Sequence, residues 1–205
     1  MEAGASGVDV VFVDVDIARC MPTLLWNELA EVVGSEAVVD FNMLTGVLTN
    51  WEAWTDFLAE HNNIDTGEAK KMLLRIFFLG KPQQDLPFLW ALSSEVRKAI
   101  NILLDAPKYA YLEGKFQDRR CPDASKIFYA LSAVEDSIVE ELACEVLARA
   151  TGTRVNSYMS DGAIFAIEGD QFAVLQDIAA EVGSKRGVVF KTEEFPRSFP
   201  GDDED

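Results

Sequence analysis

One short segment, residues 9–17 (DVVFVDVDI), constrains the fold more than any other part of the sequence. Its apolar and β-branched residues alternate with a period of two, which predicts a β-strand. Asp14 and Asp16 fall on one face of this otherwise apolar strand. Two carboxylates on such a face are costly to bury unless they are solvated or coordinated. The face that carries these carboxylates is therefore expected to be either exposed to solvent or part of a functional site. The expected faces are Val11, Val13, Val15 and Ile17 on one side, and Val10, Phe12, Asp14 and Asp16 on the other.

A β-hairpin is expected far along the chain. Apolar strands at 153–159 and 163–168 flank the turn Ser160-Asp161-Gly162. An Asp-Gly pair between alternating apolar runs is a strong hairpin signal. A helix at 171–182 and a strand at 187–191 are expected to follow.

The sequence between the first strand and the hairpin has helical spacing. Pro22 stands in the first turn of one expected helix, and a long helix is expected from Asp123 or Ser125 to Ala150. Further helices are expected at 66–80 and 88–104. This order of elements predicts an α+β fold with a small antiparallel sheet and a helical insertion.

Composition narrows the class of protein. No run of about 18 apolar residues exists, so no membrane partner is expected, and no secretory signal is recognisable at the start. Cys20, Cys121 and Cys144 are scattered and lack metal-ligand spacing, which is typical of reduced thiols in an intracellular protein. The single His61 cannot support a His-rich zinc site.

The charge is unevenly distributed. The net charge of −17 argues at first against nucleic acid as a partner. Residues 70–126, however, carry 11 bases and six acids, giving +5, between two strongly acidic segments. An acidic metal site facing a basic phosphate-binding helix would have this distribution, and so would chance variation in an acidic protein.

Asp16 and Asp161 are the candidate metal ligands. Metal-assisted phosphoryl transfer uses carboxylates on rigid strands, and a two-metal site holds its ions about 3.5–4 Å apart. An Asp at a strand end and an Asp in a hairpin turn could meet if the strands are neighbours. The competing interpretation is that Asp161 serves only the turn.

The motifs around these residues resemble those of template-dependent DNA polymerases. The run from Asp16 to Pro22 (DIARCMP) resembles motif A, in which a strand ends in Asp and Pro opens a helix six residues later. It is closer still to the replication-polymerase-like proteins of large DNA viruses and related mobile elements. The run from Tyr158 to Phe165 (YMSDGAIF) resembles their motif C, an acid in a hairpin turn.

A third run resembles motif B of family A polymerases. Lys71 and Arg75 lie four residues apart, so they share one helix face, and Leu79-Gly80 follows where that family usually has an aromatic residue before Gly. SKIFYALSAVE, residues 125–135, resembles the helix before motif C. Glu135 stands at its acidic position, and Lys191 stands where the viral group often has Lys.

The resemblance implies a DNA polymerase-like nucleotidyltransferase. Asp16 and Asp161, assisted by Asp14, would hold two Mg²⁺ or Mn²⁺ ions. Lys71, Arg75 and Ile17 would bind the incoming nucleotide; Glu135, Gly80 and Lys191 would border the cleft and template. The implied partners are template-primer and dNTPs, with room for polymerase or helicase domains from another chain.

The implied domain organisation is a palm in two parts, 1–35 and 107–195, with a helical fingers-like insertion at 36–106 and an acidic disordered tail at 196–205. Two other interpretations remain open at this stage. One is a degenerate polymerase fold that acts as a binding or scaffold module; the other is an unrelated acidic α+β interaction domain.

Overall fold

The computed structural model describes residues 10–34, 40–83, 85–159 and 161–195. The expected tail at 196–205 lies outside the described residues, as does Ser160 of the expected turn. The chain has an α+β fold, mostly helical with a four-stranded antiparallel sheet, so the predicted fold class is confirmed. It divides into two compact units. The sheet unit is Met1–Cys20 with Val134–Asp205, and the helical unit is Met21–Ala133.

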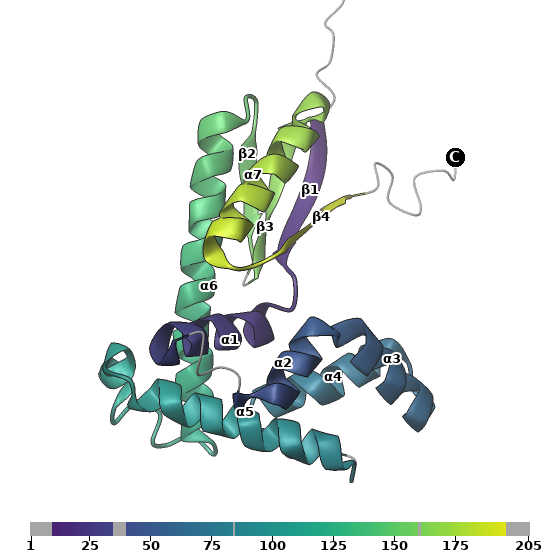
Figure 1. Ribbon diagram of the computed structural model, residues 1–205. Helices are drawn as coiled ribbons and strands as arrows, with labels where there is room; N and C mark the ends of the chain where they lie inside the picture. Colours follow the sequence, from purple (N-terminus) through teal and green to yellow (C-terminus); the bar gives the residue numbers. More distant parts are fainter. Residues whose placement is uncertain (1–9, 35–39, 84, 160, 196–205) are drawn as a thin grey trace, which may run out of the picture. The chain divides into compact units, whose positions relative to one another are not determined.

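The sheet places the first strand in its interior. Strand order is β2-β3-β1-β4, and every neighbouring pair is antiparallel. The hairpin of β2 and β3 is thus confirmed, and it lies directly beside β1 (Figure 1). The strands are β1 (Val10–Ile17), β2 (Arg154–Tyr158), β3 (Gly162–Glu168) and β4 (Phe190–Glu194).

The two faces of β1 differ as its period-two pattern predicts. Val13 and Val15 are fully buried, whereas Val10 and Phe12 are exposed and Asp14 is half-buried. Helix α7 (Phe172–Arg186) lies across the sheet in Figure 1. Ion pairs tie α7 to the second half of helix α6 (Pro122–Arg149), namely Arg149–Glu181 at 2.7 Å and Lys185–Glu141 at 2.5 Å.

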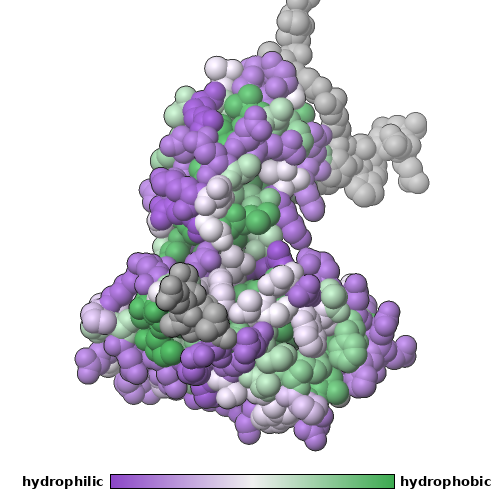
Figure 2. Space-filling view, in the orientation of Figure 1, coloured by the Kyte–Doolittle hydropathy of each residue, from purple (hydrophilic) through white to green (hydrophobic). Residues whose placement is uncertain are grey.

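The ends of the last two elements differ from the expected ones. Helix α7 continues past Gly183 to Arg186, and Gly187 follows it with the left-handed φ of 67° that suits a helix C-terminus. Strand β4 is therefore displaced to 190–194 instead of 187–191. A shallow groove of about 420 Å³ runs between α7 and β4 and contains Val188 and Val189. Figure 2 shows hydrophobic surface beside α7 among mostly hydrophilic side chains.

The helical unit packs around buried leucines from several short helices. A buried polar contact joins helix α1 (Cys20–Val33) to the 3₁₀ helix η2 (Pro107–Leu112). In this contact Glu28 accepts hydrogen bonds from the Tyr109 hydroxyl and, at 2.7 Å, from Lys108. None of the described helices is long and apolar enough to cross a membrane. The elements are α1 (Cys20–Val33), α2 (Asn42–Thr49), α3 (Trp51–Asn62), α4 (Thr66–Phe77), α5 (Pro87–Asp105), the 3₁₀ helix η2 (Pro107–Leu112) and the start of α6.

Helix α4 has well-defined ends. Asp65 caps its start by accepting the backbone N–H of Glu68 at 2.8 Å. At its end, Gly80 N–H donates to the Arg75 carbonyl at 2.8 Å and Leu79 N–H to the Ile76 carbonyl at 3.0 Å. This is a Schellman motif with Leu79, at φ 58°, in the position that usually takes Gly.

Candidate active site

Asp14 and Asp16 lie on the face of β1 opposite the buried valines. Both side chains are half-buried. One carboxylate oxygen of each, Oδ1, is fully buried and has no hydrogen-bond partner among the described residues. An unsatisfied buried carboxylate oxygen is unfavourable in the folded protein unless a cation or donor completes it. These two atoms are therefore candidate ligand atoms.

The hairpin brings Asp161 to the end of β1. Ile17 N–H donates to the Asp161 carbonyl at 2.8 Å, and Asp16 is directly opposite Gly162 in the β1–β3 register. The sequence had placed Gly162 in the turn, but in the structure Gly162 is the first residue of β3. A Cβ at this position would lie 2.2 Å from the Val15 carbonyl oxygen and 2.3 Å from Asp16 Oδ1. Glycine thus permits the close approach of the two strands.

The charges of these carboxylates affect one another. The pKa of Asp16 is raised from 3.8 to about 6, mainly by burial and in addition by the negative charges of Asp14, Asp161 and Glu193. The predicted proximity of Asp16 and Asp161 is thus present in the structure. Such a cluster favours protons or metal cations, because either reduces the repulsion.

The residues fit a hard divalent cation only in part. Among the described residues, no group of three or more His, Cys, Asp or Glu side chains is placed to hold a metal ion. Mg²⁺ is commonly held by one or two carboxylates, with water and substrate phosphates completing its shell. The orphan oxygens of Asp14 and Asp16 suit that kind of site. The assignment of Asp14, Asp16 and Asp161 as metal ligands stays a prediction.

Glu135 is more buried than its position beside the apolar stripe of α6 suggested. Its side chain is 3% exposed and accepts a hydrogen bond from Cys20 Sγ at 2.9 Å. Burial raises the pKa of Glu135; the Cys20 hydrogen bond opposes this, and the charges of Asp161 and Asp136 add to it. Burial and Glu135 also raise the pKa of the Cys20 thiol, so this thiol is a hydrogen-bond donor. Glu135 thus lies within electrostatic reach of Asp161.

Strand β4 adds two charged residues to the open face of the sheet. Lys191 is opposite Asp16 and Glu193 is opposite Asp14 in the register. Both are exposed. Glu193 was missed by sequence reasoning, because the strand was expected to end at 191. A strand extended to 194 would have placed Glu193 on the face of Lys191, because side chains two residues apart share a face.

The remaining predicted residues lie elsewhere. The Ile17 side chain is 3% exposed on the helix-covered face, and its backbone N–H is bonded to Asp161. Lys71, Arg75 and Gly80 belong to the helical unit. Lys71 and Arg75 are exposed on one face of α4, and Lys71 pairs with Glu68 at 2.6 Å. The nucleotide and cleft roles given to these residues stay predictions.

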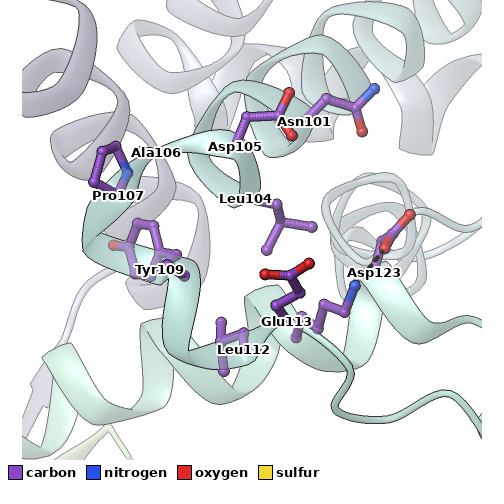
Figure 3. A pocket seen from close by; sticks show the side chains of 11 residues that line it. Asn101, Leu104, Asp105, Ala106, Pro107, Tyr109, Leu112, Glu113 and Asp123 are labelled. Atoms are coloured by element: carbon purple, nitrogen blue, oxygen red, sulfur yellow. Dashed lines mark hydrogen bonds and ion pairs between the residues drawn. The ribbon is translucent and has the colours of Figure 1, made fainter.

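A cavity of about 610 Å³ in the helical unit contains none of the predicted site residues. It lies between the end of α5, η2 and the start of α6 (Figure 3). The carboxylates of Asp105, Glu113 and Asp123 line it with Lys126. Lys126 pairs with Asp123 at 3.4 Å, and no feature of the cavity points to a particular ligand.

Comparison with known proteins gives a similarity of fold. No protein-family model and no curated protein matches the sequence. The structure is similar to the POL domain of Pol1 from M. smegmatis, solved in complex with a DNA primer-template and dNTP. The TM-score is 0.49 and the sequence identity 10%; the match covers 93% of this chain. The chain spans 40% of the length of that solved chain.

Proposed function

We propose that this chain is the core of a template-directed nucleotidyltransferase, a DNA polymerase-like enzyme. The observation that carries the proposal is the carboxylate cluster. Asp14 and Asp16 project from an interior strand, and Oδ1 of each is buried without a hydrogen-bond partner among the described residues. The backbone carbonyl of Asp161 accepts a hydrogen bond of 2.8 Å from the N–H of Ile17, the last residue of that strand. Purely structural carboxylates would be expected to be solvated or paired. The motif A, B and C resemblance is the second support.

In this proposal Asp16 and Asp161 hold Mg²⁺ or Mn²⁺, with Asp14 assisting. When bound there, the ions would supply the positive charge that stabilises the attacking and leaving oxygens of phosphoryl transfer. The protein's own contribution is to fix the carboxylates. The β1–β3 ladder and the Ile17–Asp161 hydrogen bond do so within one rigid sheet. Glu193 and Asp14 keep the site negative, which favours cation binding.

The rest of the proposal follows the resemblance. Residues 1–35 and 107–195 form the palm, and 36–106 the fingers-like insertion. Lys71 and Arg75 contact the triphosphate of the dNTP. Ile17 contributes to nucleotide binding as the residue that directly follows Asp16. Gly80, Glu135 and Lys191 border the cleft and template. The protein acts inside the cell on template-primer, with further polymerase or helicase domains supplied by another chain.

The test is extension of a labelled primer on a template with Mg²⁺ or Mn²⁺. The wild type is expected to add the nucleotide that the template base specifies. Asp161→Asn is expected to lower the rate at least about a hundredfold, because it removes a charge that positions the metal. Asp177→Asn is the control, since Asp177 is an exposed acid on α7 of the same unit. No template-dependent addition by the wild type, or equal rates in both variants, would favour a non-catalytic binding module.

A second prediction concerns the triphosphate contacts. Replacing Lys71 and Arg75 together by Ala is expected to raise the KM for dNTP at least about tenfold, because two cations one helical turn apart are lost. Stability should change little, since the Lys71–Glu68 pair is exposed. The control replaces Lys70 and Arg97, two exposed bases of the same unit, by Ala. An equal KM in the two double variants would make Lys71 and Arg75 ordinary surface residues.

A further inference from the structure

We infer that the helical unit carries a binding surface for single-stranded nucleic acid, on which bases stack against Phe128 and Tyr129 while Arg119 and Arg120 contact phosphates. This surface was not among the predicted site residues. In naming nucleic acid the inference rests on the proposed function, but binding itself needs neither metal nor catalysis. The aromatic–basic surface is formed by Tyr111, Lys115, Phe116, Arg119, Arg120, Phe128 and Tyr129.

Its aromatic side chains are exposed although they lie on a packed helix. Ile127, Ala130 and Leu131 form the buried side of α6 at this point. Phe128 and Tyr129 are each 49% exposed. Neighbouring large rings in water are unusual unless a ligand or partner covers them.

Further rings hold these two in place. The Phe128 ring is 5.9 Å from that of Phe78, and the Tyr129 ring is 5.7 Å from that of Phe116, both tilted at 52°. Each exposed ring is thus supported at one side by another aromatic side chain. A supported ring loses little conformational freedom when a flat ligand stacks on it.

Positive charge surrounds the rings. Lys115 Nζ lies 5.8 Å from the centre of the Tyr129 ring and 5.2 Å from that of Tyr111. Arg119 and Arg120 are exposed and form no ion pair with any residue that the structure describes. Asp118 and Asp123 offset part of this charge, yet residues 107–129 still carry five bases and three acids, giving +2 in a chain of net charge −17.

The two kinds of side chain share one pocket. A concavity of about 590 Å³ is lined by Phe116, Arg119, Arg120, Phe128 and Tyr129, with small residues of the first turn of α6. Its volume is within the range of roughly 300–1,000 Å³ that is usual for small-molecule sites. The loop that forms its wall turns at Gly114 (φ 74°) and at Phe116 (φ 61°).

This chemistry favours a single strand over a duplex. Aromatic side chains beside a positively charged groove bind single strands through the faces of unpaired bases. A duplex keeps those faces stacked inside, so it would meet only the cations. Nonspecific attraction by charge is also weak in a protein this acidic, so the rings are expected to supply much of the affinity.

The test is fluorescence anisotropy with the full chain in the presence of EDTA. The labelled probes are a 12-mer of deoxythymidine, a 12-mer of uridine and a 12-mer DNA duplex. The wild type is expected to bind the single strands more tightly than the duplex, and the two single-stranded probes distinguish DNA from RNA. Phe128→Ala with Tyr129→Ala should weaken single-strand binding at least about fivefold for each stacked base. Arg119→Ala with Arg120→Ala should reduce the slope of log K against log salt by roughly 1.4.

Matched controls change the same chemistry elsewhere in the helical unit. Trp90→Ala removes an aromatic side chain that is 48% exposed, and Lys70→Ala with Arg97→Ala removes two exposed bases. The inference would be overturned if the variants of the aromatic–basic surface bound single strands as tightly as the control variants did. It would also be overturned if the wild type bound the duplex more tightly than the single strands. If the wild type bound single strands as expected but did not extend a primer, only the proposed function would be overturned. If the wild type extended primers and the variants of the aromatic–basic surface showed unchanged anisotropy, only the inferred binding surface would be overturned.

Discussion

Replacing Asp16 by Asn is expected to make the protein more stable at pH 7, although the same change should abolish catalysis. Asp16 is partly desolvated and lies near three other carboxylates, which raises its pKa from 3.8 to about 6. At pH 7 the folded protein must therefore keep a carboxylate ionised where the surroundings disfavour its charge. Asn has nearly the same shape and no charge, so it removes this cost.

The pH dependence has a definite sign. Because the folded-state pKa lies above the unfolded value, the folded protein holds the extra proton between about pH 4 and 6. Stability contributed by Asp16 is therefore lost as the pH rises through this window, and the loss is complete by pH 7. A shift of two pKa units corresponds to about 3 kcal/mol at full value. Since the side chain is only half-buried, solvent screening reduces the expected effect to about 1–2 kcal/mol.

Thermal unfolding followed by far-UV circular dichroism from pH 4 to pH 7 measures this effect. Asp16→Asn should unfold at a higher temperature than the wild type at pH 7, and the difference should shrink toward pH 4. Asp177→Asn provides the baseline, because Asp177 is exposed on α7. Mn²⁺ should raise the midpoint of the wild type more than that of Asp16→Asn, since only the wild type keeps the full ligand set. A less stable Asp16→Asn protein at pH 7 would contradict this account.

Local patterns predicted the parts of the fold that depend on local chemistry. The period of two in residues 9–17 correctly assigned both faces of β1, because one face packs on helices and the other does not. The hairpin and the α+β class followed from the strand pattern and the Asp-Gly pair. Helix α4 also begins where its Asp65 cap and following residues indicate.

Contacts between distant segments could not be read in the same way. The Cys20–Glu135 hydrogen bond joins residues 115 apart, and nothing near Cys20 indicates a carboxylate partner. Glu193 joins the site only because α7 continues past Gly183 and displaces β4. The Gly183 backbone is compatible with the helix, so a glycine there gives no reliable end. The positions of such residues in the site depend on tertiary packing, which sequence periodicity does not encode.

Gly162→Ala is expected to be among the most disruptive small substitutions in the sheet unit. The added Cβ would lie 2.2 Å from the carbonyl oxygen of Val15 and 2.3 Å from Asp16 Oδ1. Val15 is fully buried in the interior strand, so its backbone cannot move without disturbing two ladders. We expect a loss of about 3 kcal/mol in the free energy of unfolding, at the upper end of the usual cost of overpacking. The same clash should displace Asp16 and lower extension activity.

Gly46→Ala is the matched control, because the chemical change is identical and the expected sign is opposite. Gly46 lies within α2, and nothing stands within 4 Å of the Cβ that would be added. Alanine in a helix interior should stabilise by about 0.5–1 kcal/mol. Chemical denaturation compares the two variants, and hydrogen exchange localises the effect. In Gly162→Ala the amides of Ile17 and Met159 should exchange faster, because they donate to Asp161 and Gly162 of the hairpin. If Gly162→Ala kept wild-type stability and slow exchange at both amides, the close approach of β3 to β1 would not be what requires glycine.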